Sequence, residues 1–327
     1  MERRKNARHT PDPADVAEFN ARAKDKMFKA FLEDPFYSSI SSKTAKDALS
    51  FDLGGCIQIY SLFEDFEKDG ARLFNAILEV PVLEGPEPDL QTSAYMNRVN
   101  AFSPFSPLVY HKKQSTYKFV IRVRANPDNL AMLVFLFPRL AALQILTAKK
   151  VFETIPSPEG LEFLVKEMDP TSTQRLVEIE ADIKNQGAAK SSRWDKLELF
   201  STSSGLESFL EKAPDGSLET IRMRFPFMKK SSEFCLDSLA AHPWLGRGLL
   251  ATTTFPVKGA KEQNQAFSIA LNGNSFSPSV EHSCFGCLYG DRDFIVHKTF
   301  VPNSMFFPDL AQHLSSNAYM LSTAENS

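Results

Sequence analysis

Apolar residues recur along the first half of this chain at helical and strand-like spacings, and the blocks they form predict its elements. An amphipathic helix should begin after the capping residue Asp12 and Pro13, because apolar positions follow at intervals of three and four: Val16, Phe19, Ala23, Met27 and Phe31. Strand-like runs follow at 51–63 and 73–83, then a helix over about 89–102. A hairpin of 108–111 with 117–125 and a long apolar helix over about 129–152 complete this half.

The second half shows the same kinds of blocks. We expect strands at 218–229 and 249–258, a helix over 261–271, a hairpin with its turn near 290–293, and a helix over 308–323. Between the halves, a helix over about 172–185 places Leu176, Ile179 and Ile183 on one stripe, and it is a candidate for the opening helix of the second half.

The two halves also share short sequences in the same order. The stretch Ala76–Gly85 reappears as Ala251–Gly259, which places Pro81 on Pro256, 175 residues later. At nearly the same offset Asn100–Pro104 recurs as Asn274–Pro278, and Phe119–Arg122 recurs as Phe294–His297.

The order of blocks predicts an α+β fold of two tandem repeats, each an antiparallel sheet with helices packed on one face. The first repeat should span residues 12–155 and the second 195–323, joined by a linker with a helix at 156–194. We expect a disordered basic tail at 1–11 and a short polar tail at 324–327.

Composition narrows the function classes. The 37 basic and 40 acidic side chains give a net charge of −3, which argues against nucleic acid or an anionic membrane as partner. The apolar run Leu130–Leu146 is shorter than a membrane span and contains Pro138, so it predicts a buried helix that the proline kinks or restarts. The first eleven residues lack the apolar core of a secretion signal, so we expect a cytoplasmic protein.

The order of elements resembles the YbjN and type III secretion chaperone-like superfamily. In the first half an asparagine-bearing helix, Met96–Phe102, is followed by a hairpin with the strand Phe119–Arg124 and by the long apolar helix. In the second half Ala270–Phe276 followed by Asp293–His297 is similar to the same pattern. The resemblance implies a bacterial, non-enzymatic module that holds an extended segment of a partner protein, and it implies no catalytic residues. Secretion chaperones of this kind act as homodimers, so this chain is either a monomer whose repeats pair as two subunits would or a homodimer.

Cys284-Phe-Gly-Cys287, with His282 and His297 nearby, is the sharpest candidate for chemistry, since two thiolates and two imidazoles can complete a zinc site. Residues three apart on a strand point to opposite faces, so we expect no zinc and no other cofactor. The chain has no glycine-rich phosphate loop, no zinc-protease motif and no hydrolase nucleophile motif.

The strand 117–125 has a candidate binding face. Its alternation places Phe119, Ile121 and Val123 on one face and basic side chains on the other. That face is either a solvated sheet surface or a site where cations bind acidic groups of a partner peptide. The candidate peptide-binding residues are His111, Lys118, Arg122 and Arg124.

The leading hypothesis is therefore a peptide- or protein-binding chaperone or adaptor whose repeats form one body. The alternative is an enzyme or small-ligand sensor with its site between the two repeats. A purely structural interaction protein is the third possibility.

Overall fold

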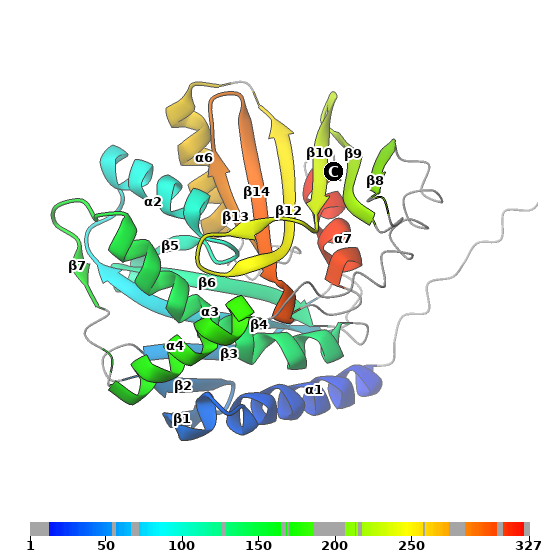
Figure 1. Ribbon diagram of the computed structural model, residues 1–327. Helices are drawn as coiled ribbons and strands as arrows, with labels where there is room; N and C mark the ends of the chain where they lie inside the picture. Colours follow the sequence, from blue (N-terminus) through cyan, green and yellow to red (C-terminus); the bar gives the residue numbers. More distant parts are fainter. Residues whose placement is uncertain are drawn as a thin grey trace, which may run out of the picture.

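The computed structural model has an α+β fold built on two antiparallel sheets, each of seven strands (Figure 1). It describes residues 13–53, 57–66, 72–125, 129–164, 168, 170–185, 207–212, 214, 218–257, 259–274, 285–305 and 310–323. The expected tails at 1–11 and 324–327 lie outside these residues. The predicted fold class is confirmed.

The first half contains one sheet and three long helices. Helix α1 (Pro13–Glu33) leads through η1 (Tyr37–Ser39) into the strands β1 (Ser41–Ala45), β2 (Ala48–Asp52), β3 (Ile57–Phe66) and β4 (Arg72–Glu84). Helix α2 (Leu90–Phe102), β5 (Leu108–His111), η2 (Lys112–Gln114), β6 (Thr116–Ala125) and α3 (Leu130–Thr154) follow. Asp89 caps α2 by accepting a 2.7 Å hydrogen bond from the Thr92 amide.

The second half follows a short strand β7 (Glu162–Phe163) and the predicted linker helix, α4 (Pro170–Asn185). Its strands are β8 (Ser208–Lys212), β9 (Leu218–Phe227), β10 (Lys230–Asp237), β11 (Ala241–His242) and β12 (Gly246–Pro256). Helix α6 (Lys261–Asn274), β13 (Cys287–Gly290), β14 (Phe294–Pro302), η3 (Asn303–Met305) and α7 (Leu310–Thr323) complete it.

Both sheets have the same strand order. The first runs β1-β2-β3-β4-β6-β5 with β7 beside β4, and the second runs β8-β9-β10-β12-β14-β13 with β11 beside β12. In each sheet a four-stranded meander is followed by a helix, and the next hairpin inserts its second strand beside the end of the meander. This agreement is what an internal repeat predicts.

One predicted strand was wrong in detail, and strand β10 was not predicted. The run 51–63 is not one strand but parts of β2 and β3, which pair with each other. Strand β10 was missed because only Phe234 and Leu236 mark its buried face with large apolar side chains. The turn that leads into β10 holds Met228 at a φ of 50° instead of the glycine or asparagine that signals a hairpin.

One hydrophobic core joins the two halves. A single cluster of buried apolar side chains runs from Ala23 and Phe31 in α1, through α3, to Phe234 in β10 and Leu314 in α7. The linker helix contributes buried Leu176 and Ile183. The repeats therefore share a core and form one body.

Helix α3 lies across the middle of this body (Figure 1). The helix continues through Pro138 without interruption, so the expectation that the proline restarts the helix is wrong. Within the described residues it is long and apolar enough to cross a membrane, but most of its apolar stretch is buried in the protein.

Candidate functional site

The residues predicted to bind a peptide do not form a solvated surface. The side chain of Lys118 is 4% exposed and that of Arg122 is 1% exposed. The side chain of Arg124 lies outside the described residues, although its backbone pairs with Asn75. The expectation of an open basic face is therefore wrong, because both faces of β6 are buried.

Lys118 and His111 occupy a partly closed polar site beside the hairpin. Lys118 Nζ lies 3.4 Å from a carboxylate oxygen of Glu79, which is itself mostly buried. Burial and, second, the charge of Lys118 lower the pKa of His111 below its usual value. This arrangement explains how a buried lysine is tolerated, since its ammonium has a carboxylate partner.

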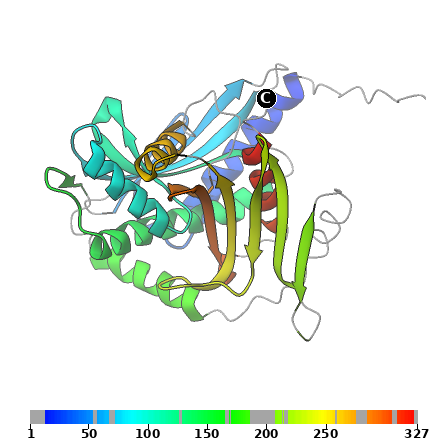
Figure 2. The same cartoon turned by 90° about the horizontal axis from the view of Figure 1, so that it is seen from above.

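The two sheets meet through paired helices instead. Figure 2 shows α2 and α6, one from each half, side by side. Helix α2 also contacts β13 of the other half, and α6 contacts β5. Each of these helices therefore lies next to the edge strand of both sheets.

An asparagine on each helix binds the edge strand of its own sheet. The Leu108 amide donates to Asn100 Oδ1 at 2.6 Å, and Asn100 Nδ2 lies 3.5 Å from the Leu108 carbonyl. In the second half the Leu288 amide donates to Asn272 Oδ1 at 3.1 Å, and Asn272 Nδ2 donates to the Leu288 carbonyl at 2.7 Å. Asn272, not Asn274, is thus the counterpart of Asn100, so the offset read from the sequence is wrong by two residues here.

A third asparagine links the halves directly. Asn97 of α2 accepts from the Gly290 amide at 2.7 Å and donates to the Gly290 carbonyl at 3.0 Å. Because Leu288 and Gly290 are two residues apart, both turn their backbone groups to the same outer edge of β13. Asparagines of the two halves therefore satisfy this edge together, and it is closed to another strand.

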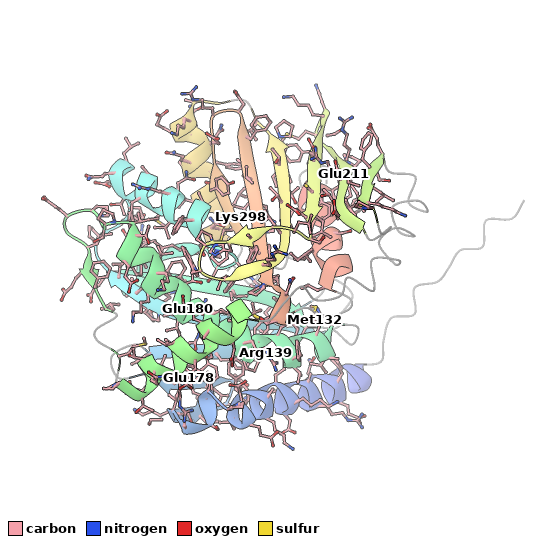
Figure 3. The ribbon with its side chains drawn as sticks, viewed as in Figure 1. Met132, Arg139, Glu178, Glu180, Glu211 and Lys298 are labelled. Atoms are coloured by element: carbon pink, nitrogen blue, oxygen red, sulfur yellow. The ribbon has the colours of Figure 1, made fainter. Side chains whose placement is uncertain are left out.

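A lysine strengthens the same interface. Lys298 of β14 donates through Nζ to the carbonyl of Ala101 in the last turn of α2. Its charge meets the negative end of the helix dipole, although burial lowers its pKa. Figure 3 shows Lys298 beside α2. Glu211 of β8 lies at the opposite side of the second sheet in the same view.

Strand β8 is an edge of a different kind. The Arg224 amide donates to the Glu207 carbonyl at 3.0 Å, so Ser208 and Leu210, at the alternate positions, direct their backbone groups away from β9. No strand among the described residues pairs with this outer side. Phe209 is 55% exposed on the same strand.

The sheet face that carries Phe209 is polar and accessible. Arg224 forms a bidentate ion pair with Glu207, with both distances 3.0 Å, and Arg222 lies 4.0 Å from Glu211. All four side chains are at least half exposed. The second sheet thus offers an edge whose outer backbone groups pair with no described strand, beside an aromatic side chain and charges of both signs.

The cysteine and histidine candidates are only partly described. Cys284 and His282 lie outside the described residues, whereas Cys287 is fully buried. His297 is buried too, and burial lowers its pKa to about 4, so the ring is neutral at pH 7. Among the described residues no group of histidine, cysteine and acidic side chains is arranged to hold a metal ion.

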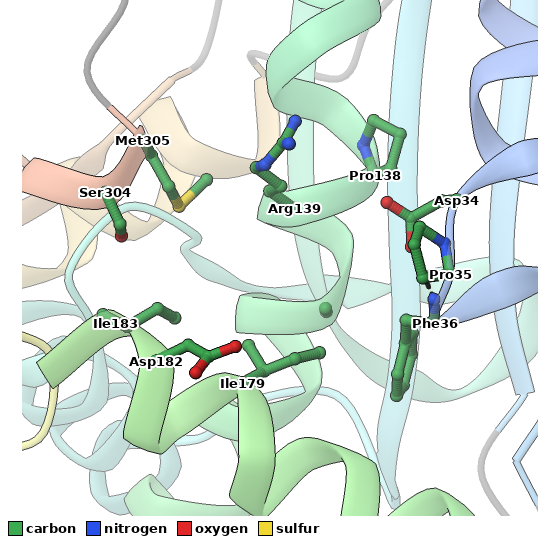
Figure 4. Close-up of a pocket in the computed structure, with 11 residues that line it drawn as sticks. Asp34, Pro35, Phe36, Pro138, Arg139, Ile179, Asp182, Ile183, Ser304 and Met305 are labelled. Atoms are coloured by element: carbon green, nitrogen blue, oxygen red, sulfur yellow. Dashed lines mark hydrogen bonds between the residues drawn. The ribbon is translucent and has the colours of Figure 1, made fainter. Parts of the chain in front are cut away.

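A cavity of about 270 Å³ lies where α1, α3, α4 and η3 meet (Figure 4). Its polar groups are Asp34, Arg139, Asp182 and Ser304, and they come from both halves and the linker. No motif in the sequence indicates this cavity, and these residues are separated by up to 270 positions. Only the apolar stripe on α4 pointed to this place, since Ile179 and Ile183 line the cavity.

Comparison of the whole sequence with protein-family models, with curated proteins and with solved structures finds no match.

Proposed function

We propose that this protein is a non-enzymatic peptide- or protein-binding chaperone or adaptor of the YbjN and type III secretion chaperone-like kind. The observation that carries the proposal is the outer edge of β8, where Ser208 and Leu210 present backbone groups beside the exposed ring of Phe209. An extended peptide binds such an edge by adding a strand, and a neighbouring aromatic side chain supplies affinity.

The other end of the sheet supports this choice. The outer backbone groups of Leu288 and Gly290 in β13 are occupied by Asn272 and Asn97. The binding surface proposed from the sequence moves accordingly, from the buried residues of β6 to β8. The partner should be an extended protein segment, and the chain that binds it is either a monomer with pseudo-dimeric repeats or a homodimer.

The test is a proline at the outer edge. Ser208→Pro removes one outward amide but no hydrogen bond to β9, because the Ser208 amide points away from that strand. Peptides selected from a random library on the full chain should bind this variant about tenfold more weakly or worse, since one hydrogen bond and the close approach of a strand are lost. Ser208→Ala is the matched control and should bind as the unaltered chain does. Equal affinity of the two variants, both folded by circular dichroism, would rule out β8 as the site.

A second candidate function is that of a small-ligand sensor with its site between the two repeats. The cavity at α1, α3, α4 and η3 favours it, because elements of both halves and of the linker line one hollow. Sites at such junctions are common, and a ligand there can change how the parts pack. Mass spectrometry of small molecules that remain with the purified chain tests this function.

A further inference from the structure

We propose that the cavity between α1, α3, α4 and η3 binds a free α-amino acid with an apolar side chain. This inference rests on the second candidate function, ligand sensing, and is independent of peptide binding at β8. The volume of about 270 Å³ lies just below the range of ordinary small-molecule sites, which suits a small ligand.

Arg139 provides the end that binds a carboxylate. Its guanidinium lies 4.1 Å from the ring centre of Phe135, and Nη1 donates to the Phe135 carbonyl at 2.7 Å. These contacts hold the group at the cavity wall while the remaining N–H donors stay available. Within the described part of the chain Arg139 forms no ion pair, so a ligand carboxylate can take its fork of donors.

Two carboxylates provide the end that binds an ammonium group. Asp182 of α4 has no hydrogen bond or ion pair to any described residue. Asp34 uses one carboxylate oxygen to accept from the Phe36 amide at 2.9 Å, which leaves the second oxygen available. Figure 4 shows the three charged groups on different sides of the hollow, with Arg139 above and Asp182 below. Opposite charges on separate walls select a ligand that carries both charges.

The remaining lining accounts for a side chain and one more polar contact. Ile179, Ile183 and Met305 form an apolar part of the wall. Beside them the Ser304 hydroxyl is shielded from solvent without a protein partner among the described residues. A buried hydroxyl needs a hydrogen-bond partner, which is either an ordered water or a polar group of a bound molecule.

The experiment is calorimetric titration of the full chain with L-leucine. Two analogues test the two charged ends: 4-methylpentanoate lacks the ammonium group, and 3-methylbutylamine lacks the carboxylate. Each analogue should bind about two- to fivefold more weakly than L-leucine, because it loses one ion pair with a solvent-exposed side chain.

Arg139→Gln and Asp182→Asn should each weaken L-leucine binding by a similar factor. Glu178→Gln is the matched control, because it neutralises a carboxylate one turn earlier on α4 that does not line the cavity. Thermal unfolding of each variant confirms its fold.

Three outcomes overturn the inference. If L-leucine binds equally to all variants, its site is elsewhere. If another class of small molecule is retained and L-leucine does not bind, the ligand class is wrong but ligand sensing survives. If no small molecule binds, ligand sensing fails as well.

Discussion

Asn97→Ala tests how the two halves are joined. Asn97 is 7% exposed and lies on α2, yet its partners belong to the other half. Besides the two hydrogen bonds to Gly290, its Oδ1 accepts from the Ser268 hydroxyl at 3.2 Å. Alanine removes all three contacts and leaves the amide and carbonyl of Gly290 without their partner.

The magnitude follows from those contacts. A hydrogen bond contributes about 1 kcal/mol net, and a buried backbone group without a partner costs about 1–3 kcal/mol. Ser268 loses least, because its single hydroxyl proton can be donated wholly to the Gln265 carbonyl at 2.8 Å. We therefore expect Asn97→Ala to lower the free energy of unfolding by about 2–4 kcal/mol.

The assay combines denaturation with hydrogen exchange. Urea unfolding followed by fluorescence gives the loss of stability, and mass spectrometry of the segment 287–290 reports the opening of β13. Arg98→Ala is the matched control, because Arg98 is the next residue of α2 and is exposed. In the Asn97 variant exchange of the Gly290 amide should rise well above that of the control.

A small effect would contradict the reasoning. If Asn97→Ala and Arg98→Ala differ by less than about 0.5 kcal/mol, the range of ordinary surface substitutions, the asparagine does not hold the interface. Unchanged exchange in 287–290 would show in addition that the edge of β13 is satisfied by other groups.

Three further predictions concern buried positions. Because burial lowers the pKa of His297 from 6.5 to about 4, its unfolded form takes up a proton first as the pH falls. Stability should therefore fall between pH 6.5 and about 4, by up to about 3 kcal/mol, and His297→Gln should reduce this loss in pH-dependent thermal unfolding. Gly286→Ala should lower the free energy of unfolding in urea by about 3 kcal/mol or more, because φ is +130° and the added Cβ would lie 2.3 Å from Thr299 Oγ1. Gly160→Ala is the comparison: φ is +86° but the added Cβ meets open space, so the free energy of unfolding should fall by about 1 kcal/mol. Arg122→Glu should lower the melting temperature far more than Arg98→Glu, because it places a carboxylate in a site that is 1% exposed; similar melting temperatures would refute this.

The sequence predicted most elements because hydrophobic spacing is local. The helices at α1, α2, α3 and α4 and both hairpins lie where apolar periodicity and capping residues placed them. Strand β10 was missed because its burial is decided by contacts with β9 and β12, which its own polar sequence does not reveal. Local propensity depends only on the residues within a segment. Whether a polar segment such as β10 becomes a strand depends also on its contacts in the folded protein.

The binding residues could not be predicted in the same way. Alternation along β6 correctly separated the two faces of the strand, but it could not show that the face of Lys118 and Arg122 is also buried. A strand in the middle of a structure is covered on both sides by elements distant in the sequence. The cavity residues Asp34, Arg139 and Ser304 are likewise brought together only by the fold.

The asparagines also explain why a tandem chain can do more than a symmetric pair. Asn100 and Asn272 play the same part in both halves, as a symmetric dimer would require. Asn97, three residues before Asn100, has Ile269 at the corresponding place on α6. Among the described residues, an asparagine of one half's helix therefore binds the other half's edge strand only at β13. In a homodimer each substitution appears twice, whereas in a single chain one copy can change alone. Because one half can change without the other, one sheet can close its edge at β13 with asparagines of both halves. The cavity beside α4 can likewise form without an equivalent cavity elsewhere in the chain.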